Sequence, residues 1–259
     1  MTPHPALFLA ALLVLAPPAA AQAPPAQGTL ASVRGCELRY ERRGPLPADA
    51  ALTAILAHGF MRDGRFMRGW ADAIAREGIA AITVDMCASS ASDGRHADNA
   101  ADLVALRQSL GVRDVVYVGV SAGGLAALIA GSQDAAATRG LLLLDPVNAG
   151  GQARSAAGKV SAPVAALVAK PQVCNAWRNI DPALATLAEA TTLQVPAASH
   201  CDFEWPSDRF CRVACLDLHD AGERERAQRR IREAAIGFLV ALASGAQSLP
   251  AWRGALGPD

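Results

Sequence analysis

The stretch YVGVSAGGLAALIAG, residues 117–131, constrains the fold more than any other part of the chain. It joins an apolar strand-like run to a small-residue helix through a Gly-x-Ser-x-Gly turn centred on Ser121. A turn this tight needs glycine two residues before and after the serine, because a Cβ there would clash with nearby backbone. The free N–H groups at the start of the helix favour negative charge at the same place. The pattern predicts a nucleophilic serine, and the competing interpretation is a plain glycine turn.

Apolar runs alternate with helical segments along the rest of the chain. Predicted strands cover 52–59, 79–85, 115–120, 140–145, 162–169 and 191–197, after an edge hairpin within 30–43, and predicted helices cover 66–77, 98–110, 122–131 and about 221–243. Continuous apolar runs are typical of strands that are buried on both faces. We therefore expect an α/β fold, a mostly parallel sheet with helices on both faces and reactive groups at the carboxyl ends of its strands. Only about fifteen residues separate Asp145 from the next strand, too few for a large cap domain.

The general base is expected in a loop after the last strand. Of the five histidines, only His200 both follows the serine and stands just after a strand-like run, TTLQVPA. An imidazole there can accept the proton of Ser121 and later deliver it to the leaving group. His58 closes the earlier run LTAILAHG and precedes the serine in a turn, which favours a structural role. The alternative for His200 is an ordinary histidine of a surface loop.

The turn after the strand at 52–59 predicts an oxyanion hole. A backbone N–H at the end of one parallel strand can point toward the serine at the end of its neighbour. We assign the two donors to the N–H groups of Phe60 and Ala122, with Met61 as the alternative to Phe60. Each donor of this kind is expected to stabilise the transition state by about 3 kcal/mol.

Two residues compete for the role of the acid that orients the imidazole. Asp145 ends the run GLLLLD, one strand after the serine, and a carboxylate behind four leucines is costly to bury without a partner such as histidine. Asp181 follows the next strand, APVAALVA, and Asp202 is too near His200 in the chain to reach round to it easily. Asp145 is preferred, and Asp181 remains open.

These features resemble the α/β-hydrolase superfamily over nearly the whole chain after its N-terminal leader. The resemblance rests on HGF at 58–60, GVSAG at 119–123 and the order serine, acid, histidine. Within it, LLLLDPV at 141–147 looks like the chlorophyllase and polyester-hydrolase branch, and the chlorophyllase pattern implies that Asp145 is the acid. Many superfamily members carry the acid one strand later, but that loop reads AKPQVCNAW here and has no carboxylate before Asp181.

The N-terminus is predicted to be a secretory signal. The run ALFLAALLVL, residues 6–15, is too short to span a membrane and is followed by Ala-x-Ala cleavage sites. The protein is therefore expected to be secreted or periplasmic, and the alternative is a disordered apolar leader. The expected division is a signal peptide at 1–21, a flexible leader at 22–29, an α/β-hydrolase domain at 30–245 and a loose tail at 246–259.

The cysteine content fits an oxidising compartment. The six cysteines are Cys36, Cys87, Cys174, Cys201, Cys211 and Cys215. An even count favours disulfides, and the sequence does not choose among the 15 pairings that six cysteines allow. Cys174 and Cys201 follow neighbouring strands and could therefore meet, and a bridge between them would brace the loop of His200. The alternative is a zinc site made by the last three cysteines and His219, although their spacing lacks a tight paired-cysteine pattern.

Three aromatic residues flank the same loops: Trp177, Phe203 and Trp205. Their side chains either line a pocket for an acyl or aromatic group or cap the hydrophobic core. The sequence does not separate these two roles.

The charge balance narrows the function classes. Lys plus Arg and Asp plus Glu each number 24, so the net charge is zero and nucleic acid is not expected as a partner. No stretch after the leader is long and apolar enough to predict a membrane span. We expect an exported serine esterase that acts on a small or polymeric ester without a cofactor or a metal. The alternatives are a hydrolase of amide, thioester or lactone bonds and a non-catalytic binding protein on the same scaffold, and the oligomeric state stays open.

Overall fold

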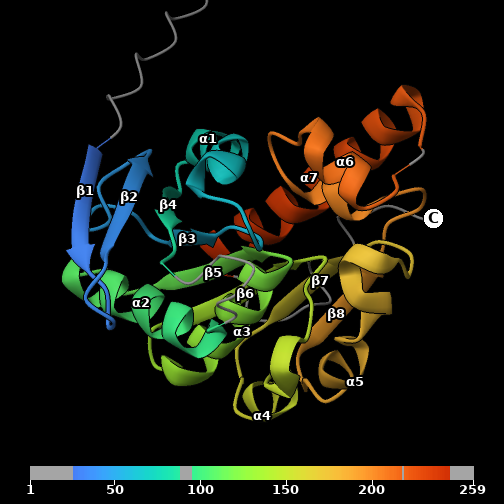
Figure 1. Cartoon of the computed structure of the whole chain (residues 1–259). Helices are drawn as coiled ribbons and strands as arrows, with labels where there is room; N and C mark the ends of the chain where they lie inside the picture. Colours follow the sequence, from blue (N-terminus) through green and yellow to red (C-terminus); the bar gives the residue numbers. More distant parts are fainter. Residues whose placement is uncertain (1–25, 88–94, 218, 246–259) are drawn as a thin grey trace, which may run out of the picture.

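The computed structural model describes residues 26–87, 95–217 and 219–245, which contain an eight-stranded sheet of order β1-β2-β4-β3-β5-β6-β7-β8 (Figure 1). Its strands are β1 (Ala26–Ala31), β2 (Glu37–Arg43), β3 (Thr53–Ala57), β4 (Ala80–Asp85), β5 (Val115–Val120), β6 (Thr138–Leu144), β7 (Val164–Val168) and β8 (Ala190–Gln194). The strands from β4 onward in this order are parallel, while β1 and β2 form an antiparallel edge. This arrangement confirms the predicted, mostly parallel sheet.

Helices cover both faces of the sheet, as Figure 1 shows. One face carries α1 (Arg68–Arg76) and α7 (Ala221–Ala243), and the other carries α2 (His96–Ser109), α3 (Ala122–Gln133), α4 (Ala153–Ala157) and α5 (Asp181–Leu184). The connections contain η1 (Gly64–Met67), η2 (Ala149–Gly151), η3 (Val173–Arg178), η4 (His200–Phe203) and α6 (Arg209–Ala214). The connection from β6 to β7 holds only η2 and α4, so no cap domain is inserted there.

The central strands are apolar along most of their length because both of their faces are buried. In β6, Leu141 and Leu143 contact the core under α2 and α3, whereas Leu142 and Leu144 contact the core under α1 and α7. All four side chains are fully buried. A strand buried on both faces has no solvent-facing position at which a polar residue would be favoured.

The edge hairpin starts earlier than predicted. β1 begins at Ala26, so residues 26–29, expected in a flexible leader, pair with β2 in regular register. Gly28 lies opposite Tyr40, and a Cβ on Gly28 would collide with the Tyr40 ring. The leader prediction is therefore wrong for these four residues, because backbone pairing with β2 orders them. The predicted signal peptide at 1–21 and tail at 246–259 lie outside the described residues.

The longest helix of the described residues is α7, with 23 residues. Neither α7 nor any other helix in this part of the chain is long and apolar enough to cross a bilayer.

Candidate active site

Ser121 stands at the turn between β5 and α3 in a strained backbone conformation, with φ 56° and ψ −120°. A Cβ on Gly119 would collide with the carbonyl group of Gly123, and a Cβ on Gly123 would collide with the carbonyl groups of Ala57 and His58. Only glycine fits at these two places. The glycines on either side of the serine are therefore needed for the turn itself, as the sequence pattern predicts.

His200 lies beside the serine, with its Nε2 3.0 Å from Ser121 Oγ. It is the first residue of η4, which follows β8, and its side chain is largely buried. Ser199 and Asp202 form a capping box at the start of η4, in which the Ser199 N–H donates to Asp202 Oδ2 and the Ser199 hydroxyl oxygen accepts from the Asp202 N–H. The cap fixes the first turn of η4 and with it the direction of the imidazole.

Asp145 lies on the far side of the imidazole. Its Oδ2 is 2.6 Å from His200 Nδ1, and its Oδ1 accepts the N–H of Ala169 at 2.9 Å and the amide of Asn175 at 3.3 Å. An ionised carboxylate only accepts, so His200 Nδ1 must carry the proton and Nε2 is left to accept from the Ser121 hydroxyl. Asp145 is buried at 1% exposure, and these hydrogen bonds offset the cost of burying its charge.

The two other aspartates considered from the sequence lie in different surroundings. Asp181 begins α5, pairs with Arg178 at 3.0 Å and has a side chain that is 45% exposed. Asp202 is committed to the Ser199 cap. The structure thus brings Ser121, His200 and Asp145 together, and neither Asp181 nor Asp202 is hydrogen-bonded to His200.

The turn after β3 runs directly past the serine. Ala57 pairs with Gly119, and a Cβ on Gly59 would lie 3.5 Å from the Ser121 Cβ. In the described part of the chain, the N–H groups of Phe60, of its alternative Met61 and of Ala122 have no hydrogen-bond acceptor. Unused donors therefore lie on the two elements that flank the hydroxyl, and the choice between Phe60 and Met61 stays open.

His58 is a buried structural residue. Its Nδ1 donates to the Gly59 carbonyl at 2.8 Å, and its Nε2 accepts the N–H of Met86 at 3.0 Å. Burial lowers the pKa of His58 below its ordinary value of 6.5, so the ring is held neutral. With both ring nitrogens occupied, His58 fixes the start of the turn and is not placed to act as the base.

The cysteines form three disulfides, Cys36–Cys87, Cys174–Cys215 and Cys201–Cys211. The pairing of Cys174 with Cys201 that the sequence left possible is not formed, because α6 and its C-cap place Cys211 and Cys215, four residues apart, between them. One turn of this helix separates Cys211 from Cys215, so a single helix face reaches both loops. The predicted bracing of the His200 loop is found by this other route, since Cys201 is the residue after His200. The zinc alternative is also wrong, because the three cysteine sulfurs it needs are in disulfides.

A second cluster of possible metal ligands consists of Asp202, Asp217 and His219, whose ligand atoms lie within 4.8 Å of one another. Protein groups already occupy it. Ser199 donates to both carboxylates, and Arg224 lies 3.9 Å from each of them. The cluster therefore acts as a support behind the His200 loop.

The three aromatic residues divide between the two roles considered. Phe203 is fully buried, and Trp205 packs edge-on against Trp70 at 5.6 Å and under Arg232 at 3.9 Å, so both cap the core. Trp177 is 69% exposed and has φ 56°. A large side chain held at the surface by a strained backbone is typical of a functional position.

Asn175 was missed by the reasoning from sequence. Its amide donates to Lys170 O at 2.9 Å as well as to Asp145, and the whole side chain is buried. It lies in the loop AKPQVCNAW, where the resemblance led us to look for a carboxylate. The position of this loop was the only feature of the sequence that could have pointed to Asn175. No sequence pattern marks an amide side chain that supports a carboxylate from another strand.

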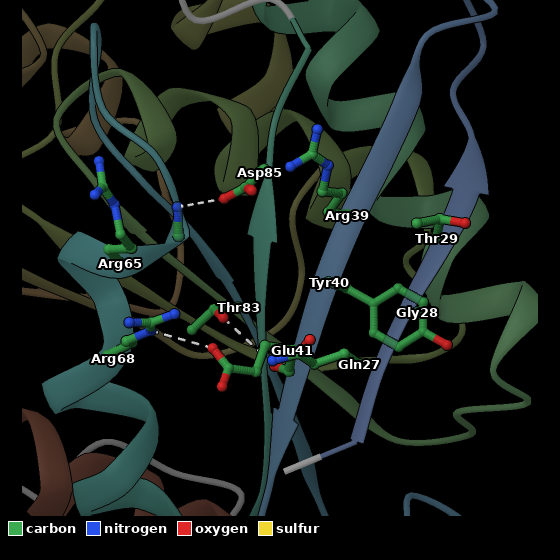
Figure 2. Close-up of a pocket in the computed structure, with 11 residues that line it drawn as sticks. Gln27, Gly28, Thr29, Arg39, Tyr40, Glu41, Arg65, Arg68, Thr83 and Asp85 are labelled. Carbon is green, nitrogen blue, oxygen red and sulfur yellow. Dashed lines mark hydrogen bonds and ion pairs between the residues drawn. The ribbon is translucent and has the colours of Figure 1, made fainter.

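A polar hollow of about 340 Å³ lies elsewhere, between the edge hairpin and η1–α1 (Figure 2). Figure 2 shows Arg68 bonded to Glu41 and the Asp85 carboxylate accepting the N–H of Gly64. None of its lining residues belongs to the group around Ser121. The candidate active site is therefore the hydrogen-bonded group at the carboxyl ends of the strands.

No protein-family model matches the sequence, and the curated proteins contain no significant match. Solved structures do match. An esterase from Exiguobacterium antarcticum has a TM-score of 0.62 at 13% identity, over 82% of this chain and 98% of that one. A dienelactone hydrolase from Anabaena variabilis has a TM-score of 0.59 at 19% identity, over 80% and 95%, and a hydrolase from Pseudomonas aeruginosa 0.59 at 15%, over 70% and 94%. At these identities the similarity establishes the architecture, and the chain has the α/β-hydrolase fold.

Proposed function

We propose that this protein is a serine hydrolase that cleaves carboxylic esters, with Ser121, His200 and Asp145 as its catalytic triad. The observation that carries the proposal is the continuous hydrogen-bonded chain from Ser121 Oγ to His200 Nε2 at 3.0 Å and from Nδ1 to Asp145 at 2.6 Å. The three side chains come from separate loops, and the carboxylate fixes the tautomer that the serine needs. Folding alone does not require such an arrangement on a strained turn.

The chemistry follows from this geometry. His200 Nε2 takes the Ser121 proton while Oγ forms a bond to the ester carbonyl carbon, and the carbonyl oxygen becomes an oxyanion between the Phe60 and Ala122 N–H groups. The C–O bond to the alcohol then breaks, and His200 returns its proton to that alcohol. Water adds to the acyl-enzyme by the same route, which releases the acid and restores Ser121. Asp145 stabilises the imidazolium and remains ionised throughout.

The surroundings of the site favour esters with apolar parts. Phe60, Met61 and Trp177 expose 41%, 52% and 69% of their surface on the loops that follow β3 and β7. Exposed apolar side chains beside a nucleophile are suited to contact an acyl or aromatic group. The structural neighbours include a dienelactone hydrolase and an enol-lactonase, so cyclic esters belong in the substrate panel.

The cysteine pairs support an extracytoplasmic site of action. Disulfides persist in oxidising compartments, and each of the six cysteines is paired in this chain. With the apolar run at 6–15, they support the proposal that the enzyme is exported.

The decisive experiment uses a fluorophosphonate probe and p-nitrophenyl acetate with the purified protein and two serine variants. Ser121→Ala is expected to abolish labelling and to lower kcat by a factor of about 10⁶. Ser132→Ala, on the same helix, removes a hydroxyl that only bonds to the Ile129 carbonyl, and it should behave like wild type. Labelling or turnover that survives in Ser121→Ala would refute the assignment. A folded wild type that neither labels nor turns over any ester, lactone, thioester or amide would favour the binding-protein alternative.

A further inference from the structure

Arg62, two residues after the proposed oxyanion donor Phe60, is buried in a way that is rare for arginine. Its side chain is only 8% exposed. Its Nε donates to Glu204 Oε1 at 2.7 Å, and its two terminal nitrogens lie 3.2 and 3.3 Å from the Asp208 carboxylate. The guanidinium therefore joins the turn after β3 to the segment that follows η4.

Aromatic rings hold the same guanidinium from its faces. Its central carbon lies 4.4 Å from the centre of the Phe66 ring and 5.5 Å from that of Phe210. A planar cation with several donors fits ring stacking and carboxylate pairing at the same time, and an ammonium group does not. The site is therefore built for arginine.

Arg62 supplies the buried side chain nearest to the exposed part of the turn after β3. The Phe60 and Met61 side chains are 41% and 52% exposed, and Met61 has φ 56°, a conformation that is unfavourable for a residue with a side chain. His58 fixes the start of the turn through its bonds to Gly59 and Met86. The next residue whose side chain is anchored is Arg62, and the strained backbone lies between His58 and Arg62. Beyond Arg62 the chain is held again at Gly64, whose N–H donates to Asp85 Oδ1 at 2.7 Å.

The other end of the Arg62 contacts belongs to the loop of the base. Glu204 directly follows η4, which starts at His200, and Glu204 is 7% exposed. Backbone bonds strengthen the connection, since the N–H of Trp205 donates to Phe66 O and the N–H of Gly69 donates to Trp205 O, both at 2.9 Å. The turn beside Ser121 and the loop of His200 thus form one connected unit.

We propose that Arg62 is a positioning residue that fixes the oxyanion turn relative to His200 through Glu204 and Asp208. The inference rests on the proposed function. It adds an account of what fixes the position of the proposed oxyanion donor relative to the base. Arg62 acts through the backbone of Phe60 and Met61 and has no contact with the reacting atoms. Its loss should therefore reduce kcat, because the oxyanion forms only in the transition state, and should leave KM nearly unchanged.

The test compares Arg62→Ala with Arg65→Ala in steady-state kinetics on p-nitrophenyl acetate. Arg65 lies on the same segment but pairs with Asp63 at the surface, with 70% of its side chain exposed, so its variant is the matched control. We expect kcat of Arg62→Ala to fall about tenfold to a hundredfold with KM within about twofold of wild type, and Arg65→Ala to match wild type. Arg62→Lys should recover little of the lost kcat. Lysine keeps the positive charge but lacks the planar guanidinium that stacks on the rings and pairs with both carboxylates.

A double variant separates positioning from stability. Arg62→Ala leaves the buried Glu204 carboxylate without its partner, whereas Arg62→Ala/Glu204→Gln removes that unpaired charge and should unfold at a temperature closer to wild type. If the double variant unfolds near the wild-type temperature and its kcat stays low, the result supports a positioning role for Arg62. If both its unfolding temperature and its kcat return to the wild-type values, the positioning proposal is overturned. If neither variant folds, Phe210→Ala decides. It removes one exposed ring from the stack, and we expect kcat to fall about twofold to fivefold, so an unchanged kcat would refute the proposal.

Failure of this proposal is distinguishable from failure of the proposed function. A wild type that does not react with the fluorophosphonate probe contradicts the function itself. A reactive wild type whose kcat is the same as that of a folded Arg62→Ala variant contradicts only the role of Arg62.

Discussion

The central sheet and the segment from η4 to α6 are stabilised in different ways. The strands β3, β5 and β6 consist of buried residues apart from Arg139 near the start of β6, and helices cover both of their faces. In α6, by contrast, Phe210 and Val213 are 59% and 76% exposed, while Cys211 is buried in a disulfide. Apolar burial orders the sheet, whereas in this segment disulfides, caps and the Arg62 contacts add to the burial of Phe203 and Trp205.

This difference divides the proposed catalytic triad. Ser121 and Asp145 follow directly from β5 and β6, so the sheet positions them, and His200 depends on the segment held by disulfides. Damage to the sheet should therefore reduce stability, and damage to the segment should reduce activity more than stability. The predictions below test this division.

Among the tests of this division, the largest expected effect is that of Asp145→Asn. The amide can keep the bond from Ala169 but no longer fixes the proton on His200 Nδ1, so kcat should fall by a factor of about 10⁴ with the fold intact. Steady-state kinetics and thermal unfolding measure both. Asp181→Asn is the control and should keep wild-type activity. The reverse result would move the acid to Asp181.

In the sheet, Leu143→Ala should lower the free energy of unfolding by about 3 kcal/mol, because it leaves a cavity at a position with 0% exposure. The kcat of the folded molecules should stay unchanged. Urea unfolding gives the free energy, and Leu216→Ala, at 72% exposure near α6, serves as the matched control with a change below about 0.5 kcal/mol. Equal losses in the two variants would contradict the comparison.

In the segment, replacing both Cys201 and Cys211 by alanine should cost about 2 to 3 kcal/mol, since the bridge spans 10 residues. Because Cys201 is next to His200, kcat should also fall about tenfold or more. Removing the Cys36–Cys87 bridge at the opposite edge is the control. It should cost at least as much stability and leave kcat unchanged. An active Cys201/Cys211 variant would show that the caps alone position His200.

The smallest expected effect concerns His58 and pH. Burial lowers its pKa below 6.5, so below that pH the unfolded chain binds a proton that the folded chain does not, and stability falls. The stability advantage of wild type over His58→Gln should therefore shrink as the pH decreases from about 8 to about 5.5, by at most about 1.4 kcal/mol per pH unit. Urea unfolding across this range measures it. Comparison with the variant separates His58 from His96, whose pKa burial also lowers. An advantage that is constant with pH would contradict the neutral ring.

The sequence predicts those features of the structure that are set by residues close together in the chain. The turn at Ser121 was predictable because two glycines and a strand-to-helix change report its sterics directly. His200 and Asp145 followed from chain order and from a carboxylate placed behind four leucines. The central sheet and the helices α1, α2, α3 and α7 were predictable for the same reason, since apolar periodicity is a local property. The short helices α4, α5 and α6 were not predicted.

The parts that escaped prediction depend on contacts between distant segments. The cysteine pairing required the placement of α6, and the support of Asp145 by Asn175 crosses 30 residues. The Arg62–Glu204 pair spans 142 residues, and no spacing in the sequence marks it. Such contacts are fixed by tertiary packing, which a single sequence does not reveal.

The two bridges beside η4 have a consequence for when the site is completed. A newly synthesised chain has thiols at 174, 201, 211 and 215, and in that state the imidazole loop lacks its covalent support. The sheet positions the hydroxyl and the carboxylate without these bridges, so only the imidazole depends on them. If the proposed function is right, the reduced chain is therefore expected to be the less active form, and the activity is expected to rise when the thiols are oxidised.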